Sequence, residues 1–541
     1  MINFKSKLPY IIGVVGHRNI VEESKQDARN HFEKIVKSYK AKYPNTPILV
    51  VTSLAEGADQ LIADVAINVE GVFLGVLIPM EIDKYLETFS NDSAREEFNR
   101  FCSKAIFVRD TSTDIVFEND FDAYRNNTRE LSNNADLLIA LWDGIASNQV
   151  GGTSDTLYYK LKKIHRPKNL TDVALNQKEF GSAIVIPVSR IGNQSPLVKK
   201  NPYSLKPVSL EETSIDEESD FIAVSKHKWN KLKFESQAPS LTYSEILTKN
   251  ALNLAVKMRK KFIIALLIIL SSSFLTIVAI EIQSRSTSKT ISVATIFVAL
   301  SAFIIYQIVT KLEIKDKYHQ FQAVSEAGEI QQLWSRVGLS QDVSDYFLTG
   351  INSSFDWMRS LVRTISFLDR AQTTMKIEAD TKEFMKIWIS RQILLRKGDS
   401  KIVGSIKKNN RLASFIRIIT IVLIIFSLFI WGYFSISLIF GIDSAISTRG
   451  LLQSLFVLAL AAAATFSSYS YLLALREMVI REEKALYALD NAMESLSMDL
   501  IELPPLVHGR EVAKSLGIFF LNETSEWYVR NYDRKVKGLL Q

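Results

Sequence analysis

Four short stretches near the start of the chain combine glycines with hydroxylated and charged residues, a mixture suited to binding phosphate and sugar groups. They are GVVGHR (13–18), TSLAEGAD (52–59), LWDG (141–144) and GGTSDT (151–156). Glycines let the backbone approach a phosphate, helix N-termini offer free N–H groups, and Arg18 adds a planar cationic fork. Carboxylates such as Glu56 and Asp59 accept hydrogen bonds from sugar hydroxyls. Together the stretches predict a pocket for a ligand that carries phosphate or ribose.

Each stretch also has a structural explanation. The first could be a tight strand end before a helix capped by Asn19, and the second a plain helix cap. His17 could act as an acid or base, although such a histidine more often caps a helix or donates to a phosphate. Trp142 could stack on a base or fill the core. No HxxxH, CxxC or acidic-triad spacing suggests a metal site.

Short apolar runs must position these stretches. The runs 9–16, 47–53, 72–79, 104–108, 135–143 and 183–188 alternate with helical patterns at 22–40, 58–66, 93–101 and 121–131. Continuous Val/Ile/Leu runs between helices predict a parallel sheet with both faces covered. An open sheet of this kind binds ligands beyond the carboxyl ends of its strands. The glycine-rich stretches fall at those ends, as does Pro79, with Ser93, Arg95 and Glu96 opening a later helix.

The ordered combination GVVGHR, SLAEGADQLIADVA, LIALWDG and GGTSDT resembles the SLOG superfamily over residues 8–190. This is the Rossmann-like group of LOG-type cytokinin-activating hydrolases and DprA-like proteins. The resemblance implies an α/β fold and a pocket for a nucleotide-derived ligand. It places ligand binding, together with the strand-end argument, on these residues: Gly16, His17, Arg18, Ser53, Glu56, Gly57, Ala58, Asp59, Arg95, Trp142, Asp143, Gly151, Gly152, Thr153 and Asp155.

The chain departs from the hydrolase motif of that superfamily. Catalytic LOG enzymes carry a PGGxGTxxE pattern, whereas no proline precedes Gly151 here, the inner glycine is missing, and Thr156 and Leu157 stand near the place of the glutamate. We therefore expect binding without hydrolysis, no catalytic residue and no cofactor. The alternative is a membrane-anchored nucleotide hydrolase in which Glu56, Asp59, Asp143 or Asp155 supplies the carboxylate.

Four apolar runs in the second half are each close to the length of a transmembrane helix: 262–280, 291–309, 418–440 and 451–475. Buried helices of a soluble protein are the less favoured explanation. Lysines and arginines flank the outer ends of both pairs, so we expect two hairpins with both termini in the cytoplasm. Residues 1–30 hold only a brief apolar strand before charged residues, so the first run is expected to serve as the insertion signal. A net charge of +7 follows from such flanks and does not imply nucleic acid.

These features predict six segments. They are a SLOG-like domain (1–192), a linker rich in Pro, Ser and acidic residues (193–241), a first transmembrane hairpin (242–311), a cytoplasmic helical region (312–411), a second hairpin (412–476) and C-terminal cytoplasmic helices (477–541). The helical region is expected to pack upon itself or to form a subunit interface. Small and hydroxylated residues in the spans favour helix packing, or a water-admitting face in a multimer. The single cysteine, Cys102, is expected in the core.

The second half resembles, more loosely, the membrane-effector halves found beside SLOG domains in bacterial conflict systems. It carries FDWMRSLVR between the hairpins and NETSEWYVRNYDRK near the end. The combined resemblance implies an inner-membrane effector of the CBASS or Thoeris type. Such a protein would sense a cyclic oligonucleotide or an ADP-ribose derivative made by a companion synthase, and permeabilise the bilayer as a homo-oligomer. A nucleotide-regulated ion channel or transporter is a further alternative.

Overall fold

The computed structural model falls into two compact units. The first comprises residues 1–250 and 327–377 and the second residues 251–326 and 378–541, so the chain passes between them within helices α8 (Tyr243–Ser284) and α10 (Ile314–Arg336). The residues described are 7–112, 119–147, 149–162, 182–192, 201–205, 212–213, 221–232, 242–339, 341–348, 356–371, 380–399, 404–439, 446–498 and 505–532.

The first unit is built on a mostly parallel sheet. Its described strands are β1 (Tyr10–Gly16), β2 (Ile48–Thr52), β3 (Val72–Ile78), β4 (Phe107–Asp110), β5 (Leu137–Trp142), β6 (Ser182–Pro187), β7 (Tyr203–Leu205) and β8 (Glu212–Thr213). Their spatial order is β4-β3-β2-β1-β5-β6-β7-β8; β7 and β8 are antiparallel and the other pairs parallel. The chain moves outward from β1 to β4 and then returns to place β5 on the other side of β1. This reversal is the switch point at which such sheets bind ligands.

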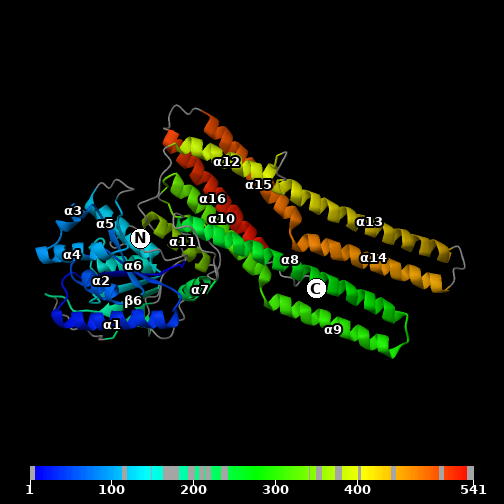
Figure 1. Cartoon of the computed structure of the whole chain (residues 1–541), viewed down its shortest axis with the longest axis horizontal. Coiled ribbons are helices and arrows are strands. Elements are labelled where there is room, and N and C mark those ends of the chain that lie inside the picture. Colours follow the sequence, from blue (N-terminus) through cyan, green and yellow to red (C-terminus); the bar gives the residue numbers. More distant parts are fainter. Residues whose placement is uncertain are drawn as a thin grey trace. The chain divides into compact units, whose positions relative to one another are not determined.

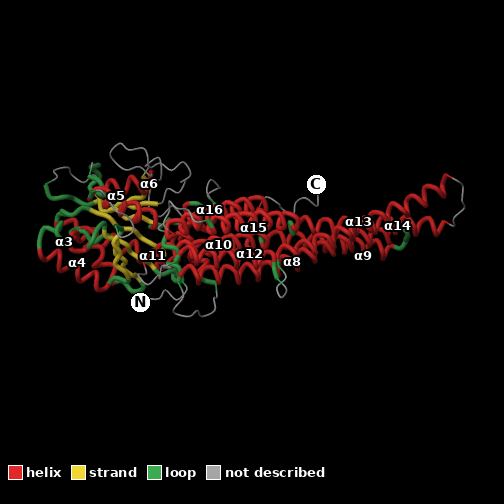
Figure 2. Tube along the Cα trace, turned by 90° about the horizontal axis from the view of Figure 1, so that it is seen from above, coloured by secondary structure: helices red, strands yellow, loops and turns green. Residues whose placement is uncertain are grey.

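Helices cover both faces of this sheet (Figures 1 and 2). On one face α1 (Glu22–Lys42) and α2 (Ala58–Asn68) bury side chains against β1, β2 and β5, including Phe32 and Ile62. Close to α2, α4 (Asp92–Lys104) buries Phe98 and Phe101 beside β3 and the short helix α3 (Ile82–Leu86). On the other face α6 (Thr153–Lys162) packs on β5 and β6, with α5 (Asp120–Asn134) beside it. The buried Val, Ile and Leu runs of the strands therefore have an apolar layer on each side.

Two helices from later in the chain complete the first unit. Lys226 of α7 (Phe221–Asn230) forms a buried ion pair with Asp136 and also donates to the Pro9 carbonyl (3.1 Å) and to Thr364 Oγ1 (2.7 Å). Thr364 lies in α11 (Asp356–Ala371), whose Ser360 Oγ donates to Asp136 Oδ1 (3.0 Å). Helices α7 and α11 are thereby fixed at the edge where β1 and β5 begin.

The second unit is helical. Besides the remainder of α8 and α10, its described elements are α9 (Lys289–Lys311), α12 (Thr381–Lys397), α13 (Ser405–Ile439), α14 (Ile446–Leu472), α15 (Leu475–Ser497) and α16 (Pro505–Tyr532). Helices α8 and α9, and α13 and α14, form two antiparallel pairs (Figure 1). Leu472 of α14 packs on Phe262, Leu266 and Leu270 of α8, so the two pairs are in contact.

Four described helical segments are long and apolar enough to span a membrane. They are Tyr243–Ser284, Lys289–Arg336, Ser405–Ser437 and Thr448–Ser497, and between 6% and 22% of the residues in their apolar windows are buried within the chain. Apolar faces this exposed argue against the core of a soluble protein and are consistent with lipid contact. The structure thus has the expected mostly parallel α/β sheet followed by a helical region with four candidate spans.

Some features predicted from the sequence differ from the structure. The stretch 193–241 was predicted to be a linker, but β7 and α7 belong to the first unit; most of its acidic run lies outside the described residues. The region 312–411 was predicted to be a cytoplasmic helical region that packs upon itself or forms a subunit interface, yet α11 packs on the sheet domain and α12 belongs to the second unit. Asn19 does not cap α1, which begins at Glu22 after Val21.

The buried ion pair gives a stability prediction. Lys226→Met leaves the Asp136 carboxylate buried without its cation, so the free energy of unfolding of the first unit should fall by about 3–5 kcal/mol. Denaturant-dependent hydrogen exchange of β1 and β5 amides in the detergent-solubilised chain measures this. The control is Lys25→Met, which breaks the surface pair with Glu22 (2.6 Å) and should cost under about 1 kcal/mol. Equal effects of the two substitutions would contradict a structural role of the buried pair.

Candidate functional site

A cavity of about 470 Å³ lies at the carboxyl ends of the central strands, at the switch point between β1 and β5. This volume is in the range of small-molecule sites. Its walls come from the segments after β1, β2, β3 and β6, from α5, and from the loop before α6. The described lining residues are Val15, Gly16, His17, Arg18, Asn19, Ser53, Ala55, Asp59, Pro79, Tyr85, Thr88, Phe121, Tyr124, Asn127, Thr128, Leu131, Ser147, Gln149, Val150, Gly151, Gly152, Thr153, Thr156 and Arg190.

The first loop contributes Gly16, His17 and Arg18. A Cβ on Gly16 would collide with the side chain of Ala58, so glycine allows β1 to approach the start of α2 closely. His17 Nε2 lies 3.0 Å from Asp143 Oδ1, yet burial outweighs this carboxylate and lowers the histidine pKa. The imidazole is therefore neutral at pH 7. Arg18 is held by a hydrogen bond from Nη1 to the Thr88 carbonyl (2.9 Å) and lies 3.8 Å from Glu56.

The second loop turns sharply after β2. Leu54, although not glycine, has φ of +53°, and Gly57 has φ of +91° with the Arg18 carbonyl where its Cβ would lie. Non-glycine residues in this region of φ are uncommon and concentrate at functional sites. The turn brings Ser53, Ala55 and Asp59 to the cavity wall.

Asp59 is the one acidic residue among the described residues that line the cavity. Burial raises its pKa to about 7, although hydrogen bonds from Thr52 and from the backbone of Ala55 and Ser53 oppose the shift. Near neutral pH this carboxyl is thus only partly charged.

The loop before α6 supplies Gly151, Gly152 and Thr153. Gly151 has φ of +71°, and its Cβ would lie 2.7 Å from Tyr124 Cβ, so a larger residue would clash with α5. Asp155 Oδ2 accepts from Gly151 N–H (2.9 Å) and so stabilises the turn. The first N–H groups of a helix lack partners within the helix, which makes the start of α6 suited to an anion.

The structure brings eight of the predicted residues to one cavity: Gly16, His17, Arg18, Ser53, Asp59, Gly151, Gly152 and Thr153. The other seven are not among its lining residues: Glu56, Gly57, Ala58, Arg95, Trp142, Asp143 and Asp155. Several of these have structural partners instead. Arg95 donates to the carbonyls of Leu86 (3.2 Å) and Phe89 (3.1 Å), and Glu56 accepts from Ser90 N–H (3.0 Å).

Trp142 belongs to the core. It packs with Leu157 and Leu161 of α6, and its Nε1–H donates to the Ile145 carbonyl (3.0 Å). The structure therefore places Trp142 in the layer between the sheet and α6, and it is not among the described residues that line the cavity. Asp143 follows it and contacts His17, so it positions the first loop from outside the cavity wall.

Sequence reasoning missed Asn127 and Arg190. Asn127 is 6% exposed; its Nδ2 donates to Ser53 Oγ (2.8 Å), while its Oδ1 is buried with no hydrogen-bond partner among the described residues. Arg190 Nε is likewise buried and unpaired there, and its Nη1 lies 3.9 Å from Asp143. Arg190 follows β6 and could have been found from the strand-end argument. Asn127 lies within a helix, where polar residues usually face solvent, so no sequence signal marked it.

The cavity therefore suits an anion that can also donate a hydrogen bond. Two guanidinium groups, Arg18 and Arg190, face one partly protonated carboxyl, and His17 is neutral. Buried polar atoms are normally paired, so Asn127 Oδ1 and Arg190 Nε mark positions for groups of a ligand or for water. The aromatic residues Tyr85, Phe121 and Tyr124 also line the cavity and supply apolar surface.

Thr156 also lines the cavity, and its hydroxyl donates to the Gly152 carbonyl (3.0 Å). Among the residues described, no three of His, Cys, Asp or Glu gather in a way that could hold a metal ion.

The chain matches no known family model, and no curated protein is significantly similar to it.

The raised pKa of Asp59 makes the stability of the folded state depend on pH. Because the folded state holds this proton up to about pH 7 and the unfolded state releases it near pH 4, folding loses stability as pH rises across that interval. Asp59→Asn removes this pH-dependent loss of stability, because the amide does not titrate. The stability of the variant relative to the wild type should thus grow by roughly 2–4 kcal/mol between pH 4.5 and pH 8, and level off above pH 7.

Hydrogen exchange of the β2 and α2 amides, measured for both proteins across this pH range, tests the prediction. The control is Asp27→Asn, at an exposed position of α1, which should show no comparable pH-dependent difference. A constant difference between wild type and Asp59→Asn at all pH values would contradict the raised pKa.

Proposed function

We propose that the first unit is a SLOG-like receptor for a nucleotide-derived ligand and that its occupancy controls a membrane region formed by the four candidate spans. The observation that carries the proposal is the cavity at the switch point, with two arginines, a glycine-rich helix start and an unpaired buried acceptor. The one carboxyl among the described lining residues is largely neutral below pH 7, which favours an anionic ligand.

The ligand class follows from the chemistry of the wall. Arg18, Arg190 and the start of α6 match phosphate oxygens, because guanidinium groups and helix N-termini both favour negative charge. Asn127 Oδ1 matches a hydroxyl or amino group, which riboses and nucleobases carry. Phe121, 67% exposed, and Tyr124 offer surfaces on which a base can stack. A cyclic oligonucleotide or an ADP-ribose derivative satisfies all three requirements.

The proposed output is permeabilisation of the bacterial inner membrane in anti-phage defence. Support comes from the chain itself: the sheet unit and the exposed apolar helices lie on one polypeptide, and α8 and α10 pass from one unit to the other. A ligand can drive such a change only if it binds the permeable state more tightly than the closed one.

The competing function is a membrane-anchored nucleotide hydrolase. Asp59 is the specific observation in its favour, since a cavity carboxyl with a pKa of about 7 can exchange protons at neutral pH. Against it, Asp59 already accepts hydrogen bonds from Thr52 and from the backbone of the second loop. A receptor function explains more of the residues that line the cavity, including the unpaired atoms Asn127 Oδ1 and Arg190 Nε.

Ligand binding is tested by calorimetry of the full-length protein with AMP, NAD, ADP-ribose and cyclic di-AMP. At least one should bind, and Arg190→Gln or Asn127→Leu should weaken binding about 10-fold or more, since each removes a buried hydrogen-bonding group. The control, Arg29→Gln on α1, breaks the pair with Asp64 (2.7 Å) and should leave affinity unchanged. Turnover of a bound nucleotide, abolished in Asp59→Asn, would favour the hydrolase instead.

Membrane output is tested by dye release from liposomes that contain the purified protein. The nucleotide that binds should increase release over the ligand-free protein, and Asn127→Leu should shift the response to about 10-fold higher nucleotide, in proportion to its loss of affinity. If a saturating nucleotide binds but causes neither dye release nor ion flux, the receptor function stands and the proposed membrane output is contradicted.

A further inference from the structure

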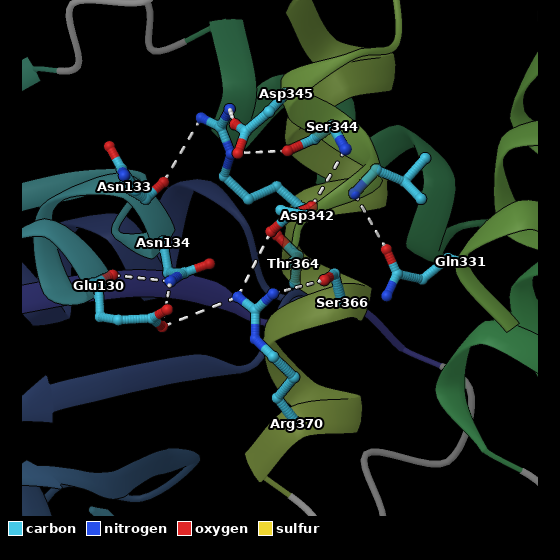
Figure 3. A network of polar contacts seen from close by, with 12 residues as sticks. Glu130, Asn133, Asn134, Gln331, Asp342, Ser344, Asp345, Thr364, Ser366 and Arg370 are labelled. Atoms are coloured by element: carbon cyan, nitrogen blue, oxygen red, sulfur yellow. Dashed lines mark hydrogen bonds and ion pairs between the residues drawn. The ribbon is translucent and has the colours of Figure 1, made fainter. Parts of the chain in front are cut away.

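Helix α5 has one side in the cavity and the other against β4 and α11. Asn127, Thr128 and Leu131 line the cavity. Glu130 and Asn133, on the same two turns, contact residues far along the chain instead (Figure 3). A shift of this helix on ligand binding would therefore displace contacts in the cavity and contacts on the opposite side of the helix.

The contacts on the second side are charged and largely buried. Glu130 Oε2 lies 3.2 Å from Arg109 Nη1 of β4 and 3.7 Å from Arg370 Nη2 of α11. Arg370 also contacts Asp342 Oδ2 (3.4 Å) and donates to Ser366 Oγ (3.1 Å). Burial alone would raise the pKa of Glu130, but the two arginines outweigh it and hold that pKa below its ordinary value.

A second arginine connects the same elements. Arg363 of α11 donates to the Asn133 carbonyl of α5 (3.5 Å), to Ser344 Oγ (3.0 Å) and to Asp345 Oδ1 (3.4 Å). Asp342, Ser344 and Asp345 belong to the turn around η2 (Val343–Asp345), which follows α10; Gln331 of α10 accepts from Val343 N–H (3.3 Å). Figure 3 shows these groups converging between α5, η2 and α11.

The residue beside Arg370 holds the start of α8. Asp369 is fully buried, and its two carboxylate oxygens accept from the backbone N–H groups of Tyr243 (2.8 Å) and Ser244 (3.1 Å). This is a helix cap supplied by another element, because Asp369 lies 125 residues further along the chain. Gln332 of α10 adds hydrogen bonds to the Ser244 carbonyl (3.1 Å) and Thr248 Oγ1 (2.7 Å), and Arg336 pairs with Glu245 (3.0 Å).

We propose that α5, Arg370 and Asp369 form a relay through which occupancy of the cavity acts on the first turns of α8, and so on the first candidate membrane hairpin. The relay rests on the proposed function for its input, and it specifies how that site regulates the second unit. Glu130 and Arg370 are positioning residues, since neither lines the cavity. Helix α8 continues without interruption from the capped residues into the first candidate span.

Buried ion pairs suit this role physically. Their partners have few alternative arrangements, because an unpaired buried charge is costly, so a displaced Glu130 must carry Arg370 with it or exchange partners. Coupling between distant sites requires such a discrete element whose state both sites influence.

The relay can be tested without any nucleotide. Glu130→Gln removes one of the carboxylates that pair with Arg370, at a residue that does not line the cavity. In the full-length protein, amide exchange at residues 243–250 should become about 10-fold faster, because loss of the pair loosens the adjacent cap. Glu97→Gln is the control: it removes a carboxylate paired with Arg100 (2.5 Å) on α4 and should leave this exchange unchanged. Wild-type exchange at 243–250 in Glu130→Gln would overturn the relay.

A second experiment adds ADP-ribose or cyclic di-AMP. In Glu130→Gln and Arg370→Gln, the Kd of the nucleotide that binds should stay within about 3-fold of wild type, while nucleotide-dependent dye release falls about 10-fold or more. Arg370→Lys, which keeps the charge, should restore part of the release. Normal release in both variants, or loss of nucleotide binding in both, would overturn the relay. Failure of the wild type to bind either nucleotide counts against the proposed function and leaves the nucleotide-free exchange to decide the relay.

Discussion

The buried carboxylate of Asp136 is the interaction on which the first unit depends. It accepts from Ile11 N–H (2.7 Å) and Ser360 Oγ (3.0 Å) and forms an ion pair with Lys226, so one side chain joins β1, α7 and α11. A buried charge is tolerated only when such partners surround it. Because Ser360 lies beyond both arms of the first candidate hairpin in sequence, this carboxylate obliges the chain to return to the sheet after that hairpin. The relay and the capped start of α8 both depend on that return.

Much of the sheet could be predicted because each strand is recognisable from its own short stretch of sequence. The continuous Val, Ile and Leu runs of β1, β2, β3 and β5 have apolar layers on both faces, and period-3.6 patterns mark α1 and α5. The placement of α7 and α11 could not be predicted in this way. Met358, Leu361 and Ile365 show that α11 has an apolar face, but only the tertiary structure shows that this face meets the sheet domain. The decisive residues, Asp136 and Lys226, are charged, and charged residues ordinarily indicate surface.

The candidate site was partly predictable for the same reason. The strand-end argument located Gly16, Arg18, Ser53 and Gly151, because parallel strands bring their carboxyl ends to one edge. It cannot tell which side of a strand a residue faces, and so it included Trp142, whose side chain packs in the core. It also cannot see a helix that crosses the edge from elsewhere. Asn127 enters the cavity in this way, and its unpaired oxygen is visible only once burial and hydrogen bonds are known.

The energetics of the proposed signal bear on the number of chains that must act together. Coupling free energies between two sites are typically about 1–3 kcal/mol. Conversion of an equilibrium from about 1:99 to about 99:1 requires roughly 5.5 kcal/mol. A single cavity acting through one capped helix start falls short of this, whereas roughly two to six copies that open in concert reach it. The proposed receptor and relay therefore favour the expectation that the membrane region works as a homo-oligomer, in which the exposed apolar and small-residue faces of the candidate spans would supply contacts between copies as well as with lipid.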